Sequence, residues 1–87
     1  VWNGFAFWIE LKTAKSSKVK ISPHQIAWHT AYWARGGKSF YLVKHLSTSD
    51  IFLFGGEKGV DLLEKGIFET EGARFKNLAP LWEHLAP

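Results

Sequence analysis

Runs of apolar residues with a two-residue period predict three short strands. They cover residues 5–12, 38–44 and 50–54 and are rich in aromatic and β-branched residues, as strands usually are. Side chains alternate between the two faces of a strand. In the first run one face therefore carries only apolar residues, whereas the other face ends in Glu10 and Lys12. These two charged residues are same-face neighbours at the end of an otherwise apolar strand.

A helix between the first two strands is predicted by its start and stop residues. Ser22 suits the N-cap, Pro23 the first helical position, and Gln25 the place that a capping box gives to Glu or Gln. Gly36-Gly37 ends the helix after about Arg35. We expect its small and apolar side to lie against the sheet, with the residues Ile26, Ala27, Thr30, Ala31, Trp33 and Ala34.

The order strand, helix, strand, with a short glycine link, predicts a parallel β-α-β crossover. A second, shorter helix is expected over residues 57–65, an extended segment within 67–75, and a last short helix over 78–85. The expected fold class is therefore α/β, with a small mixed β-sheet flanked by helices.

Length and composition limit the architecture and the compartment. The chain has 87 residues, which suits a single domain over 1–87, and we expect its core in 5–54 with a helical C-terminal extension over 55–87. The absence of cysteine excludes disulfides and thiolate metal sites and suits a reducing compartment. No signal peptide is evident, and no apolar run approaches the ~18 residues of a membrane span. We expect a cytoplasmic protein with no membrane partner.

Charge is divided unevenly along the chain. Residues 1–44 hold seven basic residues and one acidic residue, Glu10, whereas residues 45–87 hold four basic and seven acidic residues. A basic half around one acid indicates a polyanionic partner held near that acid. The loop residues Lys15, Lys18 and Lys20 are the candidate contacts to nucleic acid. The alternative is a solvated lysine-rich loop with no partner.

Glu10, Lys12 and Gln25 are the candidate catalytic residues. Hydrolysis of a phosphodiester uses a divalent metal ion to activate water and a cation to offset the charge that develops. The Glu10 carboxylate and the Leu11 carbonyl are hard oxygen ligands that suit Mg²⁺, and Lys12 suits the second role. Two structural alternatives stay open: an ion pair between Glu10 and Lys12 on the rim of the sheet, and a capping role alone for Gln25.

The order of these motifs resembles the PD-(D/E)XK nuclease superfamily. The strand ending in Ile9-Glu10-Leu11-Lys12, the basic loop, Ser22-Pro23-His24-Gln25 at a helix start, and Gly36-Gly37 before an aromatic strand are similar to small phage and bacterial VRR-NUC and Holliday-junction-resolvase-like proteins. The resemblance covers residues 5–54. It implies a restriction-endonuclease-like core. This core would be N-terminally truncated if the strand that precedes the E-x-K strand in the family is missing.

This resemblance also implies an activity and a set of roles. The expected activity is that of a Mg²⁺- or Mn²⁺-dependent endodeoxyribonuclease acting on branched or structured DNA in the cytoplasm of a bacterial or phage-infected cell. Glu10 is then the metal ligand together with Leu11, Lys12 the catalytic lysine and Gln25 the supporting residue. We expect His29 to line the site or to contact DNA, and the protein to be a homodimer.

One departure from the family pattern leaves alternatives open. The family's first acid, an aspartate, lies on the strand before the E-x-K strand, and residues 1–9 contain no acid. Either the chain is truncated before that aspartate, or it is a degenerate copy that binds nucleic acid without cleaving it. A third hypothesis is an interaction domain that functions through its aromatic surface.

Overall fold

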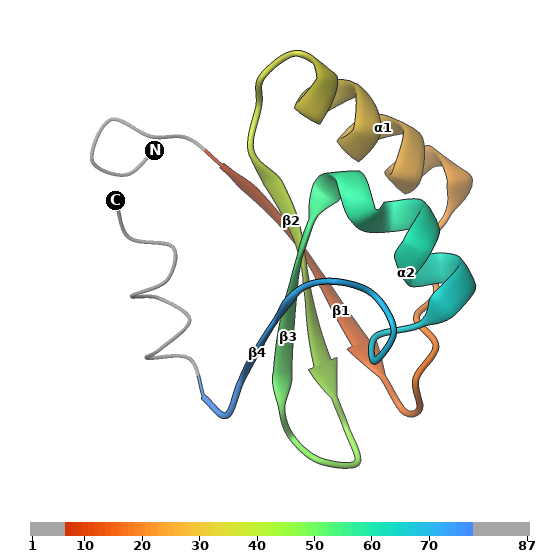
Figure 1. Ribbon diagram of the computed structural model, residues 1–87, viewed down its shortest axis with the longest axis vertical. Coiled ribbons are helices and arrows are strands. Elements are labelled where there is room, and N and C mark those ends of the chain that lie inside the picture. The colour runs from red at the N-terminus through yellow and green to blue at the C-terminus, as the bar shows by residue number, and fades with distance from the viewer. Residues whose placement is uncertain (1–6, 78–87) are drawn as a thin grey trace.

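The computed structural model describes residues 7–77, which form one small α/β unit with four strands and two α-helices (Figure 1). The elements are, in chain order, β1 (Trp8–Ala14), α1 (Pro23–Ala34), β2 (Ser39–His45), β3 (Ile51–Gly55), the 3-10 helix η1 (Gly56–Lys58), α2 (Gly59–Lys65) and β4 (Ala73–Phe75). The α/β class and the mixed sheet expected from the sequence are therefore confirmed. The helix expected over 78–85 lies outside the described residues.

The four strands form one mixed sheet in the order β1-β2-β3-β4. Strands β1 and β2 are parallel, with Glu10 opposite Tyr41 and Lys12 opposite Val43, whereas β3 and β4 each run antiparallel to their predecessor. The predicted β-α-β crossover is thus present, with α1 as its connection. Strand β4 brings the chain after residue 55 back into the sheet, so this part is more than a helical extension.

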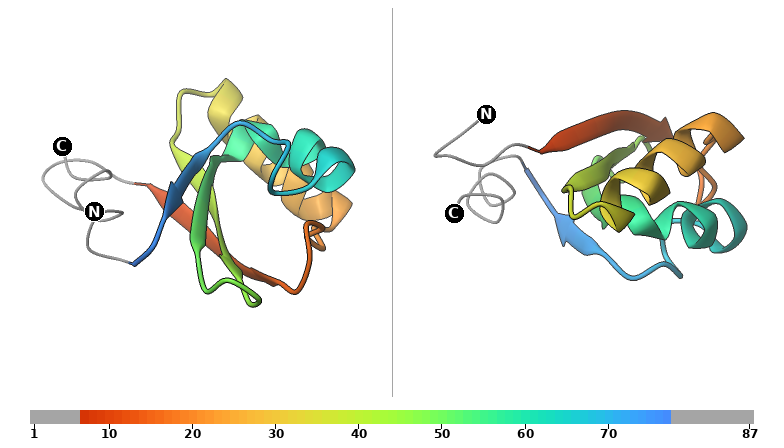
Figure 2. Two further views of the ribbon diagram at one scale, coloured as in Figure 1. Left: turned by 60° about the horizontal axis from the view of Figure 1, so that its bottom comes forward. Right: turned by 90° about the horizontal axis from the view of Figure 1, so that it is seen from above.

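Both helices lie on the same side of the sheet (Figure 2). Strand β2 shows the reason, because its alternate residues Ser39, Tyr41, Val43 and His45 are buried toward the helices. Leu62 anchors α2 with no exposed surface. Burial of a side chain of this size contributes about 1.5–3 kcal/mol, so α2 is held by packing more than by its polar sequence.

The orientation of α1 differs from the sequence prediction. Ala27, Thr30, Ala31 and Ala34 are exposed, and the one fully buried residue of the helix is His29. The buried stripe therefore runs through a histidine. The prediction holds for Ile26, which packs against the core, and for Trp33, whose Nε1 donates to the Ser39 carbonyl. It was wrong for the other four residues because it ranked residues by hydropathy, whereas the sheet offers His29 a polar partner in Ser39.

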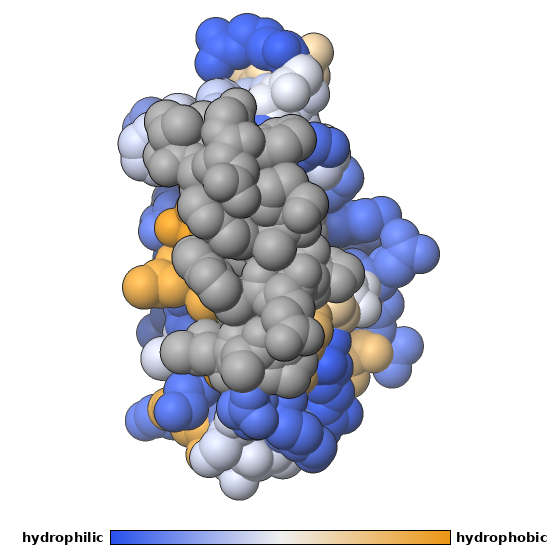
Figure 3. Space-filling model, turned by 90° about the vertical axis from the view of Figure 1, so that its left-hand side faces the viewer, coloured by the Kyte–Doolittle hydropathy of each residue, from blue (hydrophilic) through white to orange (hydrophobic). Residues whose placement is uncertain are grey.

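Several large apolar side chains remain exposed, and apolar patches break the hydrophilic surface in Figure 3. On β1 these are Trp8, 59% exposed, and Leu11, 72% exposed. Strand β1 lies at one end of the strand order, so its second edge is unpaired within residues 7–77. Within the same residues no helix is long and apolar enough to cross a membrane.

Candidate functional site

Strand β1 directs Glu10 and Lys12 toward the helix layer. Their register partners on β2 are Tyr41 and Val43, both fully buried beneath the helices. Register partners on neighbouring strands point to the same face of a sheet. The two charged side chains therefore emerge at the boundary between β1 and α1, where each is partly buried.

The start of α1 supplies the group that holds Lys12. Ser22 caps the helix, with its Oγ accepting from the Gln25 backbone N–H at 3.1 Å, while Gln25 Oε1 accepts from the Ser22 backbone N–H at 3.2 Å. This confirms the predicted capping box. The same Oε1 also accepts a hydrogen bond from Lys12 Nζ at 2.8 Å. One oxygen of Gln25 thus fixes both the helix start and the ammonium group.

The carboxylate of Glu10 does not form an ion pair with Lys12. Within the described residues, the one ionisable group inside ion-pair distance is His29, whose Nε2 lies 3.9 Å from Oε1 of Glu10. The Glu10 side chain is 36% exposed. Lys12 is engaged with Gln25 instead, so the rim salt bridge considered from the sequence is not formed. The carboxylate remains half-buried and without compensation by a fixed cation.

A buried polar cluster lies beneath Glu10. His29 is 1% exposed, and its Nδ1 lies 2.7 Å from Ser39 Oγ. The His29 ring packs on Tyr41, with ring centroids 4.2 Å apart. His29 therefore lines the site from below, and its ring has almost no surface with which to contact DNA directly.

Burial sets the protonation states of this cluster. Desolvation lowers the pKa of His29 below its usual value of 6.5, although the nearby Glu10 carboxylate opposes the shift. Desolvation, together with the charge of Glu10, raises the pKa of Tyr41 to about 12. Both side chains are thus neutral near pH 7.

Sequence reasoning missed Ser39 and Tyr41 as parts of the site. The information was available, because the two-residue period of β2 places both on one face and the parallel crossover places that face beside Glu10. What the period does not reveal is the pairing with His29, which depends on the rotation of α1 about its own axis.

The Leu11 carbonyl points away from β2. The Trp8 backbone N–H donates to the Lys38 carbonyl at 3.0 Å, and the Ala14 carbonyl accepts from Leu46 at 2.8 Å. A parallel ladder uses every second residue of a strand. The peptide groups of the even-numbered residues therefore face β2, and the Leu11 carbonyl faces the edge that is unpaired within residues 7–77.

These oxygens fit a hard divalent cation, although the donor set is small. Residues 7–77 contain no group of three or more His, Cys, Asp or Glu side chains that could hold a metal ion. Asp50 does not supply a second carboxylate to this site. It lies beside the C-terminal end of β2, where its buried carboxylate binds Arg74 and Lys76. The fit rests on the uncompensated Glu10 carboxylate and the outward-facing Leu11 carbonyl.

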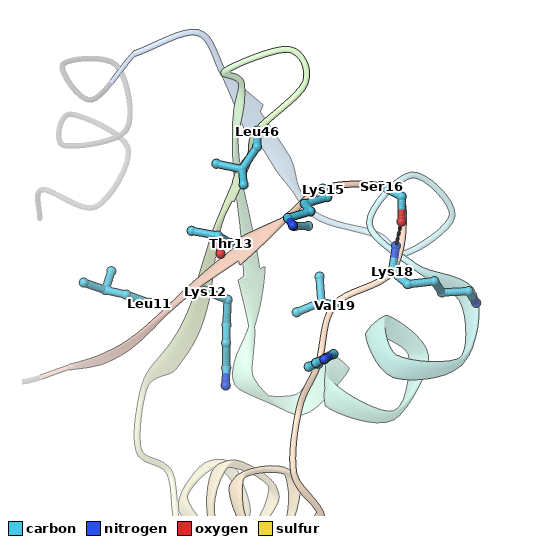
Figure 4. Close-up of a pocket in the computed structure, with 10 residues that line it drawn as sticks. Leu11, Lys12, Thr13, Lys15, Ser16, Lys18, Val19 and Leu46 are labelled. Carbon is cyan, nitrogen blue, oxygen red and sulfur yellow. Dashed lines mark hydrogen bonds between the residues drawn. The ribbon is translucent and has the colours of Figure 1, made fainter.

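The basic loop forms one wall of an open groove of about 690 Å³ that begins at Lys12 (Figure 4). Lys15, Lys18 and Lys20 all line it. The Lys18 side chain points away from Lys12 in Figure 4, and its Nζ donates to the Glu64 carbonyl at 2.6 Å. A smaller groove joins Lys12 and Lys20 to Gln25. The cationic surface is thus continuous with the candidate catalytic residues.

Three aromatic residues adjoin the site on its solvent side. Trp28 stacks on Tyr32 with ring centroids 5.1 Å apart, meets Trp8 edge to face at 6.0 Å, and covers one edge of His29. Trp28 is 44% exposed. Trp28 therefore shields His29 from water on that side, and Trp8 and Tyr32 pack on Trp28.

Comparisons of the chain with protein-family models, with curated proteins and with solved structures find no match.

Proposed function

We propose that this protein is a metal-dependent endodeoxyribonuclease that hydrolyses phosphodiester bonds of branched or structured DNA, on a PD-(D/E)XK core of the restriction-endonuclease type. The observation that carries the proposal is the hydrogen bond of 2.8 Å between Lys12 and Gln25, formed beside a half-buried Glu10 that has no fixed cation. A structural ion pair would have joined Lys12 to Glu10. Here the ammonium group and the carboxylate are held apart, each available to a further group.

Each residue then has a chemical role. Glu10 and the Leu11 carbonyl would hold Mg²⁺ or Mn²⁺, which supplies neutralisation of the phosphate charge and a lower pKa of bound water. Lys12 offsets the negative charge that develops on the phosphate and orients the attacking water. Gln25 keeps the ammonium group of Lys12 in one position through its Oε1.

The groove beside Lys12 would hold the DNA backbone. Lys15 and Lys20 are exposed, and within the described residues their ammonium groups form no hydrogen bond or ion pair. Lysine side chains of this kind act on phosphates through charge, so the contacts carry little sequence preference.

A homodimer is part of the proposal. The exposed Trp8 and Leu11 side chains of β1 favour burial against a second copy, while the Leu11 carbonyl at the strand edge stays open to the metal ion. A two-fold assembly suits a substrate with two equivalent arms. Sedimentation at micromolar concentration tests this part, and a monomer would remove it.

The alternative function is a nucleic-acid-binding module on the same fold. It is favoured by the single carboxylate that residues 7–77 bring to the site. The interaction-domain hypothesis relies on the exposed Trp8 and Trp28 instead.

One experiment separates these functions. Linear, flapped and four-way DNA are incubated with the protein in Mg²⁺, in Mn²⁺ and in EDTA, alongside the Lys12→Ala variant and a Lys44→Ala control on β2. A nuclease cleaves only with metal and loses at least about a hundredfold in rate in Lys12→Ala, while Lys44→Ala remains active. Salt-sensitive DNA binding without cleavage would support the binding module. A protein that neither cleaves nor binds DNA would support the interaction domain.

A further inference from the structure

One buried nitrogen in this site has no partner. Within the described residues, His29 Nε2 is the single buried side-chain nitrogen or oxygen that forms no hydrogen bond. An unsatisfied buried polar atom costs about 1–3 kcal/mol. Such an atom in a native site calls for an explanation, and here it faces the Glu10 carboxylate.

The distance between these two groups narrows the explanation. Nε2 of His29 and Oε1 of Glu10 are 3.9 Å apart, too far for a hydrogen bond, which ends near 3.2 Å. Metal bonds to imidazole nitrogen and carboxylate oxygen are about 2.0–2.2 Å long, so two such bonds at a tetrahedral angle span about 3.4 Å. The gap is therefore a few tenths of an ångström wider than one shared metal ion requires, and a small rotation of the partly exposed Glu10 side chain would close it.

The other side of the ring is fixed as in metal-binding histidines. Nδ1 lies 2.7 Å from Ser39 Oγ, and a hydroxyl can either accept from an N–H or donate to a ring nitrogen. When Nδ1–H donates to Ser39, the lone pair of Nε2 is directed toward Glu10. A hydrogen bond from the second ring nitrogen to a protein oxygen is the usual support of a histidine that binds metal.

Packing holds this arrangement rigidly. A Cβ added at Gly56 would lie 2.0 Å from Ser39 Oγ and 2.8 Å from His29 Nδ1, so the backbone of η1 presses on the pair. Tyr41 and Trp28 pack on the ring itself, with centroids at 4.2 and 5.1 Å. The ring cannot turn away from Glu10 without moving these neighbours.

We infer that Glu10 and His29 Nε2 together form a binding site for a divalent transition-metal ion. An imidazole ligand favours Zn²⁺ and Ni²⁺ over Mg²⁺, Ca²⁺ and Mn²⁺, which prefer oxygen. The inference deepens the proposed nuclease function, since it assigns a second side-chain ligand to the ion that Glu10 would hold. It also offers a reason for a buried histidine on a helix whose small residues face the solvent.

The test measures metal binding without DNA. Calorimetric titrations of Mn²⁺, Zn²⁺ and Mg²⁺ compare the unsubstituted protein with His29→Asn and with His24→Asn, an exposed histidine of the same helix as control. We expect His29→Asn to weaken Zn²⁺ binding about tenfold or more, to weaken Mn²⁺ binding less, and to leave the weaker Mg²⁺ binding almost unchanged. His24→Asn should bind all three metals as the unsubstituted protein does.

A second measurement avoids substitution, in case His29→Asn unfolds the chain. A long-range ¹H–¹⁵N spectrum of the unsubstituted protein reports each ring nitrogen, and Zn²⁺ should shift Nε2 of His29 while Nδ1 stays protonated. Zn²⁺ binding that leaves this nitrogen unchanged, or equal metal affinities in His29→Asn, would overturn the inference.

The outcomes also separate the inference from the proposed function. A shifted His29 nitrogen without any DNA cleavage would support the metal site and contradict the nuclease. Cleavage in Mg²⁺ with an unshifted His29 nitrogen would support the nuclease and contradict the metal site.

Discussion

At the scale of single residues, Gln25 combines a structural role with a role in the candidate site. Its side-chain oxygen accepts from the Ser22 backbone and from Lys12 Nζ. Substitution can separate the two roles because the capping box has a second half, the bond from the Gln25 backbone N–H to Ser22 Oγ. Removing that half leaves the contact to Lys12 in place.

We therefore predict different results for Gln25→Ala and Ser22→Ala. Each should lower the free energy of unfolding by up to about 1 kcal/mol, since each removes part of the helix cap. Only Gln25→Ala should also lower the rate of DNA cleavage, because Lys12 then loses its hydrogen-bond acceptor. Urea denaturation and single-turnover cleavage measure the two effects. Equal losses of cleavage in both variants would mean that Gln25 acts only through the helix.

Asp50 is a second residue whose role the sequence does not reveal. Its carboxylate is 2% exposed and accepts bonds from Arg74 Nε at 2.7 Å and from Lys76 Nζ at 3.1 Å. These hydrogen bonds lower the pKa of Asp50 from 3.8. The folded protein thus binds a proton at Asp50 less readily than the unfolded chain does. The contacts of Asp50 with Arg74 and Lys76 therefore stabilise the fold above pH 3.8, and this contribution is lost as the pH falls further.

The sign of this linkage gives a prediction for Asp50→Asn. The variant should be less stable than the unsubstituted protein at neutral pH and should lose less stability on acidification below about pH 4. Urea denaturation across this pH range measures both. Asp61→Asn, at a half-exposed residue of α2, serves as the control and should retain the acid dependence. An unchanged acid dependence in Asp50→Asn would contradict the assignment.

At the scale of elements, η1 supports the candidate site from behind. Gly56 leaves no room for a side chain, because an added Cβ would meet Ser39 and His29, whereas Gly36 has open space and a φ of +86°. Both glycines should resist substitution, one for lack of space and the other for backbone strain.

We predict that Gly56→Ala and Gly36→Ala both destabilise the fold but that only Gly56→Ala alters the site. In Gly56→Ala the Ser39 and His29 side chains must move, which should shift the ring resonances of His29 and lower metal affinity. In Gly36→Ala the cost is about 1 kcal/mol from the left-handed backbone, and the His29 resonances should stay in place. Undisturbed His29 resonances in folded Gly56→Ala would mean that η1 does not position the ring.

The elements also show which parts of the structure a sequence pattern can predict. The bounds of α1 and the parallel crossover followed from Ser22, Pro23 and Gly36-Gly37, because caps and glycine stops act locally. The face that α1 buries could not be predicted in this way. Burial of His29 depends on its hydrogen bond to Ser39, which lies on another element, β2. Side-chain partners across the fold are not encoded in any local period.

The candidate site shows the same division. The sequence grouped Lys12 and Gln25 as candidate catalytic residues, and in the structure a hydrogen bond joins the two side chains. The sequence did not predict that Lys12 and Glu10 form no ion pair. Their positions two residues apart on one face of a strand allow such a pair. Sequence reasoning also passed over Tyr41, which reads as an ordinary core residue until the register places it beside Glu10.

At the scale of the whole molecule, charge is the property that the proposed function uses. The basic half of the sequence supplies the groove at Lys12, whereas the lysines of α2 and η1 pair with nearby acids: Lys65 with Asp61 and Lys58 with Glu71. Lys15 and Lys20 are therefore free cations in the groove beside the candidate site. Long-range attraction of DNA should be directed there.

This distribution predicts the salt dependence of DNA binding. Lys15→Gln/Lys20→Gln should reduce the slope of log K against log salt by about 2, as expected for two lost phosphate contacts on duplex DNA. Lys18→Gln should change it less, because Lys18 is already bound to the Glu64 carbonyl. The control Lys58→Gln/Lys65→Gln should keep the slope. Fluorescence anisotropy at several salt concentrations measures it, and equal slopes in all variants would place the DNA elsewhere.

The central claim is that Glu10 is the metal-binding acid of a nuclease, and cleavage by Glu10→Gln tests it most directly. The substitution keeps the shape of the side chain and removes its charge, and Glu57→Gln, at an exposed acid of η1, is the matched control. With a labelled four-way junction in Mg²⁺ or Mn²⁺, we predict that the unsubstituted protein and Glu57→Gln cleave and that Glu10→Gln does not, although it still binds the junction. Cleavage by Glu10→Gln at the unsubstituted rate would contradict the account.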